Sequence, residues 1–179
     1  MNLNELRDEA YSIAKANGWH EEEHSDEHWL MLIITEIAEA VQADRKNLHA
    51  DVEAFKKYEH TLDFKENFER QIKNTVEDEL ADIVIRCLDL AGLRGIYFRY
   101  ADMLFAKCVR ELQFSFQELM YLACEEITCH CYDLTERLNS LVAEIIAYCN
   151  QKDIDLDFFI RTKMNYNRLR GYKHGGKRY

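Results

Sequence analysis

The clearest helical pattern in this chain is Thr75-Val-Glu-Asp-Glu79-Leu-Ala-Asp82-Ile-Val-Ile-Arg-Cys-Leu88. Its apolar residues recur at the 3.6-residue period of an α-helix with one buried face; they are Val76, Leu80, Ile83, Val84, Cys87 and Leu88. Glu79 and Asp82 lie within this apolar pattern, and residues three apart share one helix face with Cβ atoms roughly 5–6 Å apart. The pair can therefore offer its oxygens to one small, hard cation.

A second stretch has the same character: Trp29-Leu-Met-Leu-Ile-Ile-Thr-Glu36-Ile-Ala-Glu39-Ala-Val41. It is too apolar for a solvated surface helix, so Glu36 and Glu39 need partners that offset their charge. A single acidic pair at this spacing is common on solvated helices, but two pairs on apolar helices favour a metal site. Two facing helices of this kind would bring together Glu36, Glu39, Glu79 and Asp82 as four metal ligands.

Composition predicts a single all-α domain over residues 1–179. The chain has no proline and only six glycines, so it is short of helix-breaking residues. Its longest uncharged apolar stretch, Trp29–Thr35, is far shorter than the ~20 residues that cross a bilayer. The N-terminus also lacks the apolar core of a signal peptide. We therefore expect no association with membranes and a cytoplasmic location.

The charge is acidic overall but uneven. The formal net charge of −10 disfavours general nucleic-acid binding, which relies on basic contacts to phosphates. Residues 161–179 nevertheless contain no acidic side chain and seven basic ones: Arg161, Lys163, Arg168, Arg170, Lys173, Lys177 and Arg178. This segment is either a solvated basic C-terminus or part of a site for a small polyanion such as a nucleotide.

Apolar periodicity and capping residues place the helices along the chain. The expected segments are Leu3–Asn17, a helix from Ser25 or Asp26 to about Lys46, an amphipathic excursion within 47–72, a helix to about Leu90 that Thr75 can cap and whose end Gly92 and Gly95 mark, Ser115 to about Cys129, Leu134–Tyr148, and a last helix from Asp153 or Asp155 to before Gly171.

Other metal-like patterns carry less weight. His24 and His28 have a helical spacing, but they lie at a helix entrance, where a solvated capping segment is the simpler interpretation. Cys129-His130-Cys131 is expected to be helical, and neighbouring helical residues point about 100° apart, which disfavours a shared zinc ion. The six cysteines are therefore expected to be reduced, mostly in the core.

These residues resemble a known family. Glu36-x-x-Glu39, Glu79-x-x-Asp82 and the distal segment with Lys163, Asn167 and Arg170 are similar to the MazG-like all-α nucleoside triphosphate pyrophosphohydrolases. The ending Tyr172-Lys173-His174-Gly-Gly-Lys177 also resembles one bacterial branch, and the matched blocks cover about half the chain. The segments near 47–72 and 96–150 are longer than the compact family pattern, so the resemblance implies a helical bundle of this type with two inserted helical segments.

The resemblance also implies an activity. The four carboxylates would bind Mg²⁺, with Mn²⁺ as a substitute, and Glu36 or Glu39 would orient water for attack on the α phosphorus of a nucleoside triphosphate. The products would be a nucleoside monophosphate and pyrophosphate. Lys163, Asn167 and Arg170 would bind the phosphate chain, with Lys173 and Lys177 closing over it. Family members commonly form homodimers or homotetramers, which this sequence permits.

Two alternatives remain at this stage. A ferritin-like di-iron bundle needs Glu-x-x-His on two helices, and both well-placed pairs here are purely carboxylate. A non-catalytic nucleotide- or metal-binding helical module is the second alternative. Trp19, Trp29 and Tyr166 are candidates for stacking on a base, although aromatic side chains beside helices more often fill the core. The preferred base and sugar stay open.

Overall fold

A computed structural model describes residues 1–99 and 115–176, and the regular elements in these ranges are all helical, which confirms the all-α fold class. The helices are α1 (Leu3–Ala16), α2 (Asp26–Arg45), α3 (Val52–Tyr58), α4 (Phe64–Gln71), α5 (Val76–Arg94), α7 (Phe116–Thr128), α8 (Leu134–Gln151), α9 (Leu156–Leu169) and the short turn α10 (Lys173–Gly176). None of the described helices is long and apolar enough to cross a membrane.

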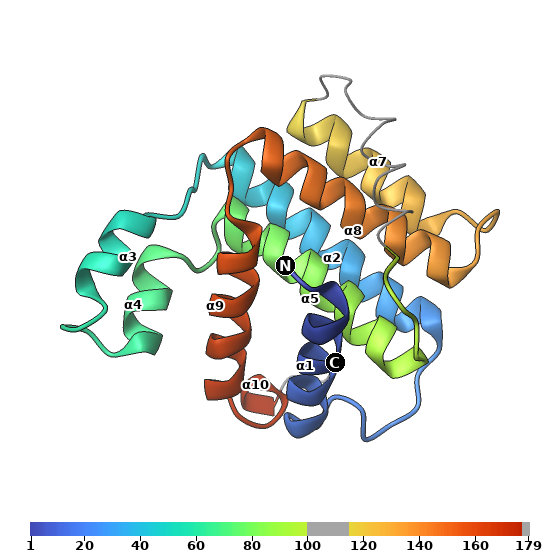
Figure 1. Cartoon of the computed structure of the whole chain (residues 1–179), viewed down its shortest axis with the longest axis horizontal. Coiled ribbons are helices and arrows are strands. Elements are labelled where there is room, and N and C mark those ends of the chain that lie inside the picture. The colour runs from blue at the N-terminus through green and yellow to red at the C-terminus, as the bar shows by residue number, and fades with distance from the viewer. Residues whose placement is uncertain (100–114, 177–179) are drawn as a thin grey trace.

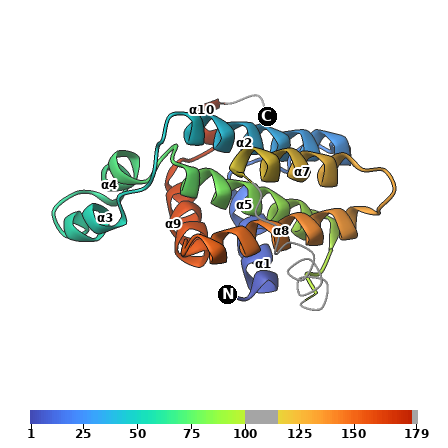
Figure 2. The same ribbon diagram turned by 90° about the horizontal axis from the view of Figure 1, so that it is seen from above.

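Helix α5 is the centre of the bundle. It contacts α1, α2, α8 and α9, and Figures 1 and 2 show it surrounded by these helices. Its apolar face is fully buried, with Ile83, Val84 and Leu88 at 0% exposure. The stretch that predicted one apolar helix face therefore forms the core to which the other long helices pack.

Local sequence signals set most helix boundaries. The hydroxyl of Thr75 accepts a hydrogen bond from the Asp78 amide and so caps α5, while Ser115 and Glu118 form the expected capping box at α7. The expected end of α5 near Leu90 was wrong, because the helix continues to Arg94. Gly92 lies inside it, where a Cβ atom would sit 2.5 Å from Cβ of Tyr11. This glycine permits close approach of α1, and Gly95, at φ +67°, ends the helix.

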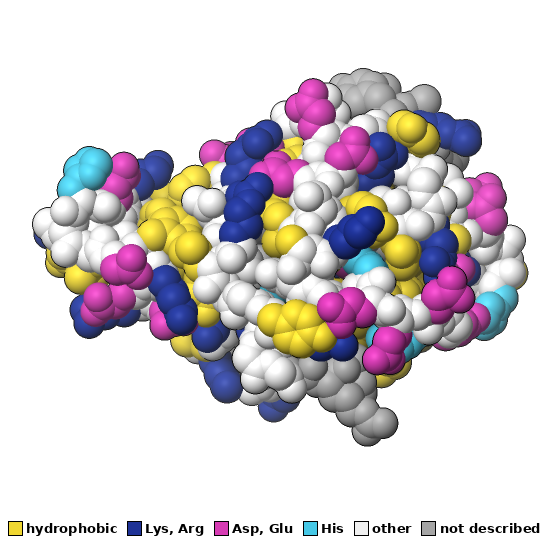
Figure 3. All heavy atoms as spheres, turned by 90° about the horizontal axis from the view of Figure 1, so that it is seen from below, with side chains coloured by type: hydrophobic (Ala, Val, Ile, Leu, Met, Phe, Trp, Pro, Cys, Tyr) yellow, Lys and Arg dark blue, Asp and Glu magenta, His cyan; other side chains and the backbone are white. Residues whose placement is uncertain are grey.

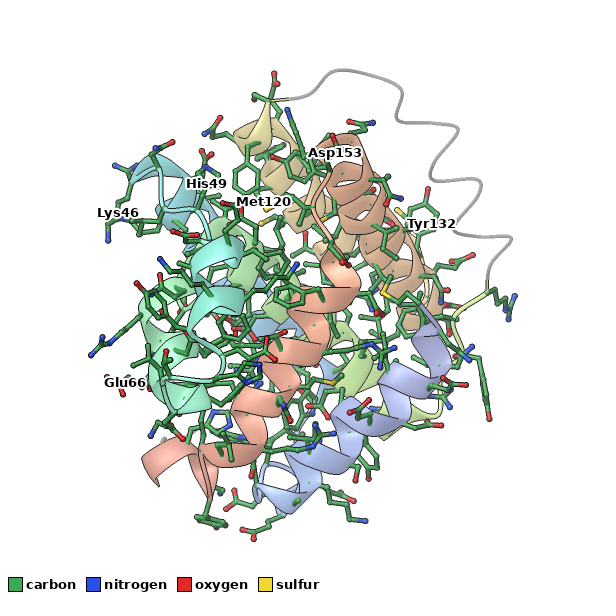
Figure 4. All side chains as sticks on the ribbon, turned by 60° about the vertical axis from the view of Figure 1, so that its left-hand side comes forward. Lys46, His49, Glu66, Met120, Tyr132 and Asp153 are labelled. Carbon is green, nitrogen blue, oxygen red and sulfur yellow. The ribbon has the colours of Figure 1, made fainter. Side chains whose placement is uncertain are left out.

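The expected excursion within 47–72 is a helical hairpin of α3 and α4 that projects from one end of the bundle (Figures 1 and 2). Its base is closed by backbone hydrogen bonds from Asp51 N to Gln71 O and from Val76 N to Leu48 O, both 3.0 Å long. Figure 4 shows Lys46 and His49 where the chain leaves α2, and Glu66 on the outer face of α4. The hairpin is thus anchored at its base, beside the start of α5.

An aromatic contact attaches this hairpin to α9. Phe68 of α4 is fully buried and stacks on Tyr166 of α9, with ring centroids 4.4 Å apart. The Tyr166 hydroxyl donates a hydrogen bond to Glu69 at 2.7 Å. Figure 3 shows further hydrophobic side chains at the junction of hairpin and bundle, on the left of that view. The hairpin therefore supports the helix that carries the basic segment.

The segment after α5 covers the other side of the bundle, with α7 packed on α2 and α8 packed on α5. Helix α7 ends at Thr128, and Cys129 adopts an extended backbone, so the Cys129-His130-Cys131 segment is a turn and not helical as expected. The five described cysteines are free thiols; Cys87 and Cys149 are buried, and Cys131 is exposed. The sixth, Cys108, lies outside the described residues.

Candidate metal centre

Four helices line one cavity of about 500 Å³. Each contributes one face at helical spacing, which is the pattern expected when parallel or antiparallel helices surround a central space. The lining includes Ala10 and Ala14 from α1 with Asn17 just after it, Glu36 and Glu39 from α2, Glu79, Asp82, Arg86 and Asp89 from α5, and Lys163, Tyr166 and Asn167 from α9 with Arg170 just after it. Carboxylates and basic side chains thus share one cavity of a size usual for small-molecule sites.

Three of the four predicted metal ligands converge in this cavity. Carboxylate oxygens of Glu36, Glu39 and Glu79 all lie within 4.8 Å of one another. Glu36 and Glu79 are buried, whereas Glu39 is exposed. Oxygen ligands are the kind that Mg²⁺ and Mn²⁺ prefer, and the described residues add no histidine or cysteine to this group.

The two buried carboxyl groups are held in conditions that disfavour their ionised forms. Burial, together with the charge of Asp82, raises the pKa of Glu79 to about 9. Burial and Asp82 also raise the pKa of Glu36 to about 7, although Arg86 opposes this by donating a 2.9 Å hydrogen bond from Nε to Glu36 Oε1. Oε2 of Glu79 is buried with no hydrogen-bond partner among the described residues. A cation at this position would compensate both features.

Asp82, the fourth predicted ligand, has a different partner. Its Oδ2 lies 2.6 Å from Nζ of Lys163, which is also 2.8 Å from Oδ2 of Asp78. Burial alone would lower the pKa of Lys163, but Asp82 and Asp78 outweigh it and raise that pKa. The structure therefore places Lys163 as a buried counter-charge between two carboxylates of α5.

Asp78 is a site residue that the sequence interpretation missed. It is 1% exposed, and it accepts hydrogen bonds from Lys163 Nζ and from the Asn74 amide at 2.9 Å. Burial raises its pKa to about 6 even though Lys163 opposes the shift. No signal in the sequence distinguished Asp78 from the capping acids of a helix start, because its partner lies 85 residues away on α9.

The sequence interpretation also missed Arg86 and Asp89 as site residues, although their spacing from Glu79 and Asp82 could have identified them. They continue the Glu79–Asp82 stripe one and two turns further along α5. Asp89 Oδ1 lies 2.7 Å from Nε2 of His20, and both side chains are buried. Polar residues at helical spacing on the cavity face of an otherwise apolar helix indicate that the polar site extends for about three turns.

The remaining predicted residues divide into three groups. Asn167 and Arg170 line the cavity, with the guanidinium of Arg170 5.6 Å from the centroid of the Tyr166 ring. Lys173 does not line this cavity; it borders a smaller neighbouring one with Glu22 and Trp29. Lys177 lies outside the described residues.

Among the three aromatic candidates, only Trp19 remains partly accessible. Trp29 is 5% exposed and packs against histidine rings, and Tyr166 is 3% exposed and stacks on Phe68. Trp19 is half-buried and lines both cavities. The surface seen in Figure 3 carries Lys, Arg, Asp and Glu side chains interspersed, without a broad patch of one sign.

Comparisons of this chain with protein-family models, with curated proteins and with solved structures found no match. The chemistry proposed below therefore depends on the residues of the cavity and on the resemblance of their motifs.

Proposed function

We propose that this protein is a Mg²⁺-dependent nucleoside triphosphate pyrophosphohydrolase similar to the MazG-like family. The observation that carries the proposal is the convergence of Glu36, Glu39 and Glu79 in one cavity with Asn167 and Arg170 of the facing helix. An acidic protein can bind a polyanion at such a place if metal ions lie between carboxylates and phosphates. The cavity volume of about 500 Å³ is suitable for a nucleotide.

The unpartnered oxygen of Glu79 and the all-oxygen donor set fit Mg²⁺, with Mn²⁺ as a substitute. Glu36, Glu39 and Glu79 would hold it, and Asp82 would join them if Lys163 moved away. Bound Mg²⁺ supplies positive charge for the phosphate chain and lowers the pKa of water. We also propose that the segments near 47–72 and 96–150 are insertions relative to the compact family pattern, and that the protein assembles as a homodimer or homotetramer.

Among the carboxylates, Glu39 is the best candidate for the general base. Glu36 already accepts a hydrogen bond from Arg86, whereas no ion pair or hydrogen bond engages Glu39 within residues 1–99 and 115–176. Glu39 would accept a proton as water attacks the α phosphorus, and the bond to the β,γ-pyrophosphate would break. Arg170 and Asn167 would hold the phosphate chain and stabilise the charge that develops on the leaving pyrophosphate.

The test is a Mg²⁺-dependent hydrolysis panel over ordinary and modified ribo- and deoxyribonucleoside triphosphates, with product separation. We expect monophosphate and pyrophosphate. Glu39→Gln should reduce kcat by about 10²-fold or more, as expected for loss of a general base, while Glu125→Gln, an exposed position on α7, serves as the matched control. Release of diphosphate and orthophosphate, or an undiminished rate in Glu39→Gln, would refute the assignment.

A non-catalytic nucleotide-binding module is the second candidate. The pairing of Lys163 with Asp78 and Asp82 favours it, because that pairing engages a cation otherwise expected to contact phosphate. Mg²⁺-dependent nucleotide binding by calorimetry without release of pyrophosphate would support the module over the enzyme.

A further inference from the structure

The chain after α9 folds back on the cavity as a short segment, Gly171–Gly176, which we name the C-terminal strap. It contains the turn α10, which lies near the end of α1 in Figure 1. His174 of the strap lines the same cavity as the carboxylates, and so does Arg170, the residue that immediately precedes the strap in the sequence. The strap is therefore part of the wall of the proposed substrate site.

Tyr172 fastens the strap to the connection between α1 and α2. Its hydroxyl donates a 2.6 Å hydrogen bond to Glu21. Its ring lies directly on Gly18, where a Cβ atom would be 2.3 Å from Cε2 of Tyr172. Gly18 has φ +81°, so it permits both the turn after α1 and the close approach of this ring.

Further contacts join the strap, α1 and α9 around the cavity. The Lys173 amide donates to Asn17 O at 2.8 Å, and Asn17 Nδ2 donates to Asn167 O at 3.0 Å. The rings of Trp19 and His174 meet edge to face with centroids 5.2 Å apart. These contacts connect Asn17, the residue after α1, directly to the strap, and connect Asn167 of α9 to the strap through Asn17.

The strap backbone is strained where these contacts hold it. Lys173 and His174 have φ values of +41° and +49°, a region that residues other than glycine seldom occupy. Such conformations persist where surrounding contacts determine them, and they gather at ligand-binding sites. The strap would relax to other conformations if its attachment through Tyr172 were lost.

Position along α9 indicates what the strap would contact. Lys163 touches Asp82, and Arg170 lies seven residues later, or about 10 Å along the helix axis at 1.5 Å per residue. A nucleoside triphosphate whose α phosphate lies at the carboxylates and whose β and γ phosphates extend along α9 would therefore approach Arg170 and the strap.

We propose that Tyr172 is a positioning residue that holds the C-terminal strap against the cavity and so retains bound nucleotide. This inference rests on the proposed function. Release of the strap should weaken substrate binding and leave the chemical step at the carboxylates unchanged, because Tyr172 holds the strap through Glu21 and Gly18, on the connection after α1, and the carboxylates lie on α2 and α5.

The test compares Tyr172→Ala and Gly18→Ala with Gly95→Ala as the matched control. Gly95 also has a positive φ, of +67°, at a helix end, but nothing lies within 4 Å of a Cβ placed there. Gly95→Ala therefore reproduces the backbone penalty without touching the strap. Tyr172→Ala and Gly18→Ala should raise KM about tenfold, the factor that corresponds to roughly one lost contact, with kcat within about twofold.

A second readout is cleavage by trypsin after Arg170 and Lys173, followed by mass spectrometry without nucleotide. Faster cleavage in both strap variants than in wild type and Gly95→Ala is expected. Wild-type turnover with unchanged KM in both strap variants would overturn this proposal alone. Equal cleavage rates would also overturn it, by showing that Tyr172 does not hold the strap. Absence of any nucleotide binding or turnover in wild type would instead overturn the proposed function and the retention role together.

Discussion

Lys163→Met is the perturbation that best tests how the cavity is stabilised. Met retains most of the aliphatic length of Lys but removes the ammonium group that bridges Asp78 and Asp82. The Lys163 and Asp78 side chains are 6% and 1% exposed, so water cannot solvate the carboxylate that is left without a counter-charge. Removal of one partner from a buried ion pair costs about 3–5 kcal/mol, because it leaves the other charge uncompensated.

That magnitude predicts a large change in melting temperature. For a chain of this length, about 2–4 °C per kcal/mol gives a fall in Tm of roughly 6–20 °C. The free energy of unfolding is measured by urea titration, with Tm by calorimetry, in the metal-free protein. Lys65→Met, at an exposed position on α4, is the matched control and should change stability little.

The pH dependence separates an electrostatic loss from simple loss of packing. Burial raises the folded-state pKa of Asp78 from 3.8 to about 6 with Lys163 present, and removal of Lys163 should raise it further. A carboxyl group whose pKa is higher in the folded than in the unfolded state takes up a proton on folding. The protein therefore loses stability as the pH rises above the unfolded-state pKa of that group, and the loss is larger when the folded-state pKa is higher. The deficit of Lys163→Met should therefore be larger near pH 8 than near pH 5.

Two results would refute this reasoning. One is a loss of less than about 1 kcal/mol at pH 8, which is the size expected of an exposed ion pair. The other is an equal loss at both pH values, which would indicate packing and not charge. The double variant Asp78→Asn with Lys163→Met should recover part of the loss, because it removes one of the two uncompensated carboxylates.

Two further predictions concern the metal and the core. Mg²⁺ should raise Tm more at about pH 8.5 than at about pH 6. The reason is that protons compete with the metal for Glu36 and Glu79, whose pKa values are raised to about 7 and about 9. If calorimetry gave an equal shift in Tm at both pH values, that result would argue against binding at these carboxyl groups. Gly92→Ala should lower the free energy of unfolding by about 1–3 kcal/mol through overpacking against Tyr11. Urea titration measures it, and an unchanged or higher free energy of unfolding would show that α1 moves aside without cost, because alanine alone favours a helix interior over glycine.

Much of the fold could be predicted because the signals are local. Apolar periodicity predicted the long helices. Thr75, Ser115 and Asp155 each cap the start of a helix near the expected position. Gly92 misled the prediction of the α5 end, since a glycine within a helix can serve close packing as readily as termination. The distinction depends on Tyr11, a residue of another helix, which local sequence does not reveal.

The carboxylate cluster could be predicted in part for the same reason. Spacing places Glu36 with Glu39, and Glu79 with Asp82, on helix faces, and the contact between α2 and α5 brings three of the four together. The pairing of Asp82 with Lys163 could not be predicted, because it depends on how α9 docks on α5. The strap could not be predicted from the sequence either, because Tyr172 contacts Gly18 and Glu21 only in the folded chain.

Charged side chains around the cavity offset part of the repulsion among its carboxylates. Lys163 offsets Asp78 and Asp82, and Arg86 offsets Glu36, so a buried cation on α9 and a half-buried one on α5 neutralise much of the acidic wall. Glu79 has no such partner, and its raised pKa means that a proton takes that place near neutral pH. A divalent ion would displace that proton and make Glu79 a ligand, which couples metal binding to proton release. In this arrangement Lys163 and Arg86 stabilise the acidic wall of the cavity, while Glu79 and the exposed Glu39 are available to bind the ion and to act in chemistry.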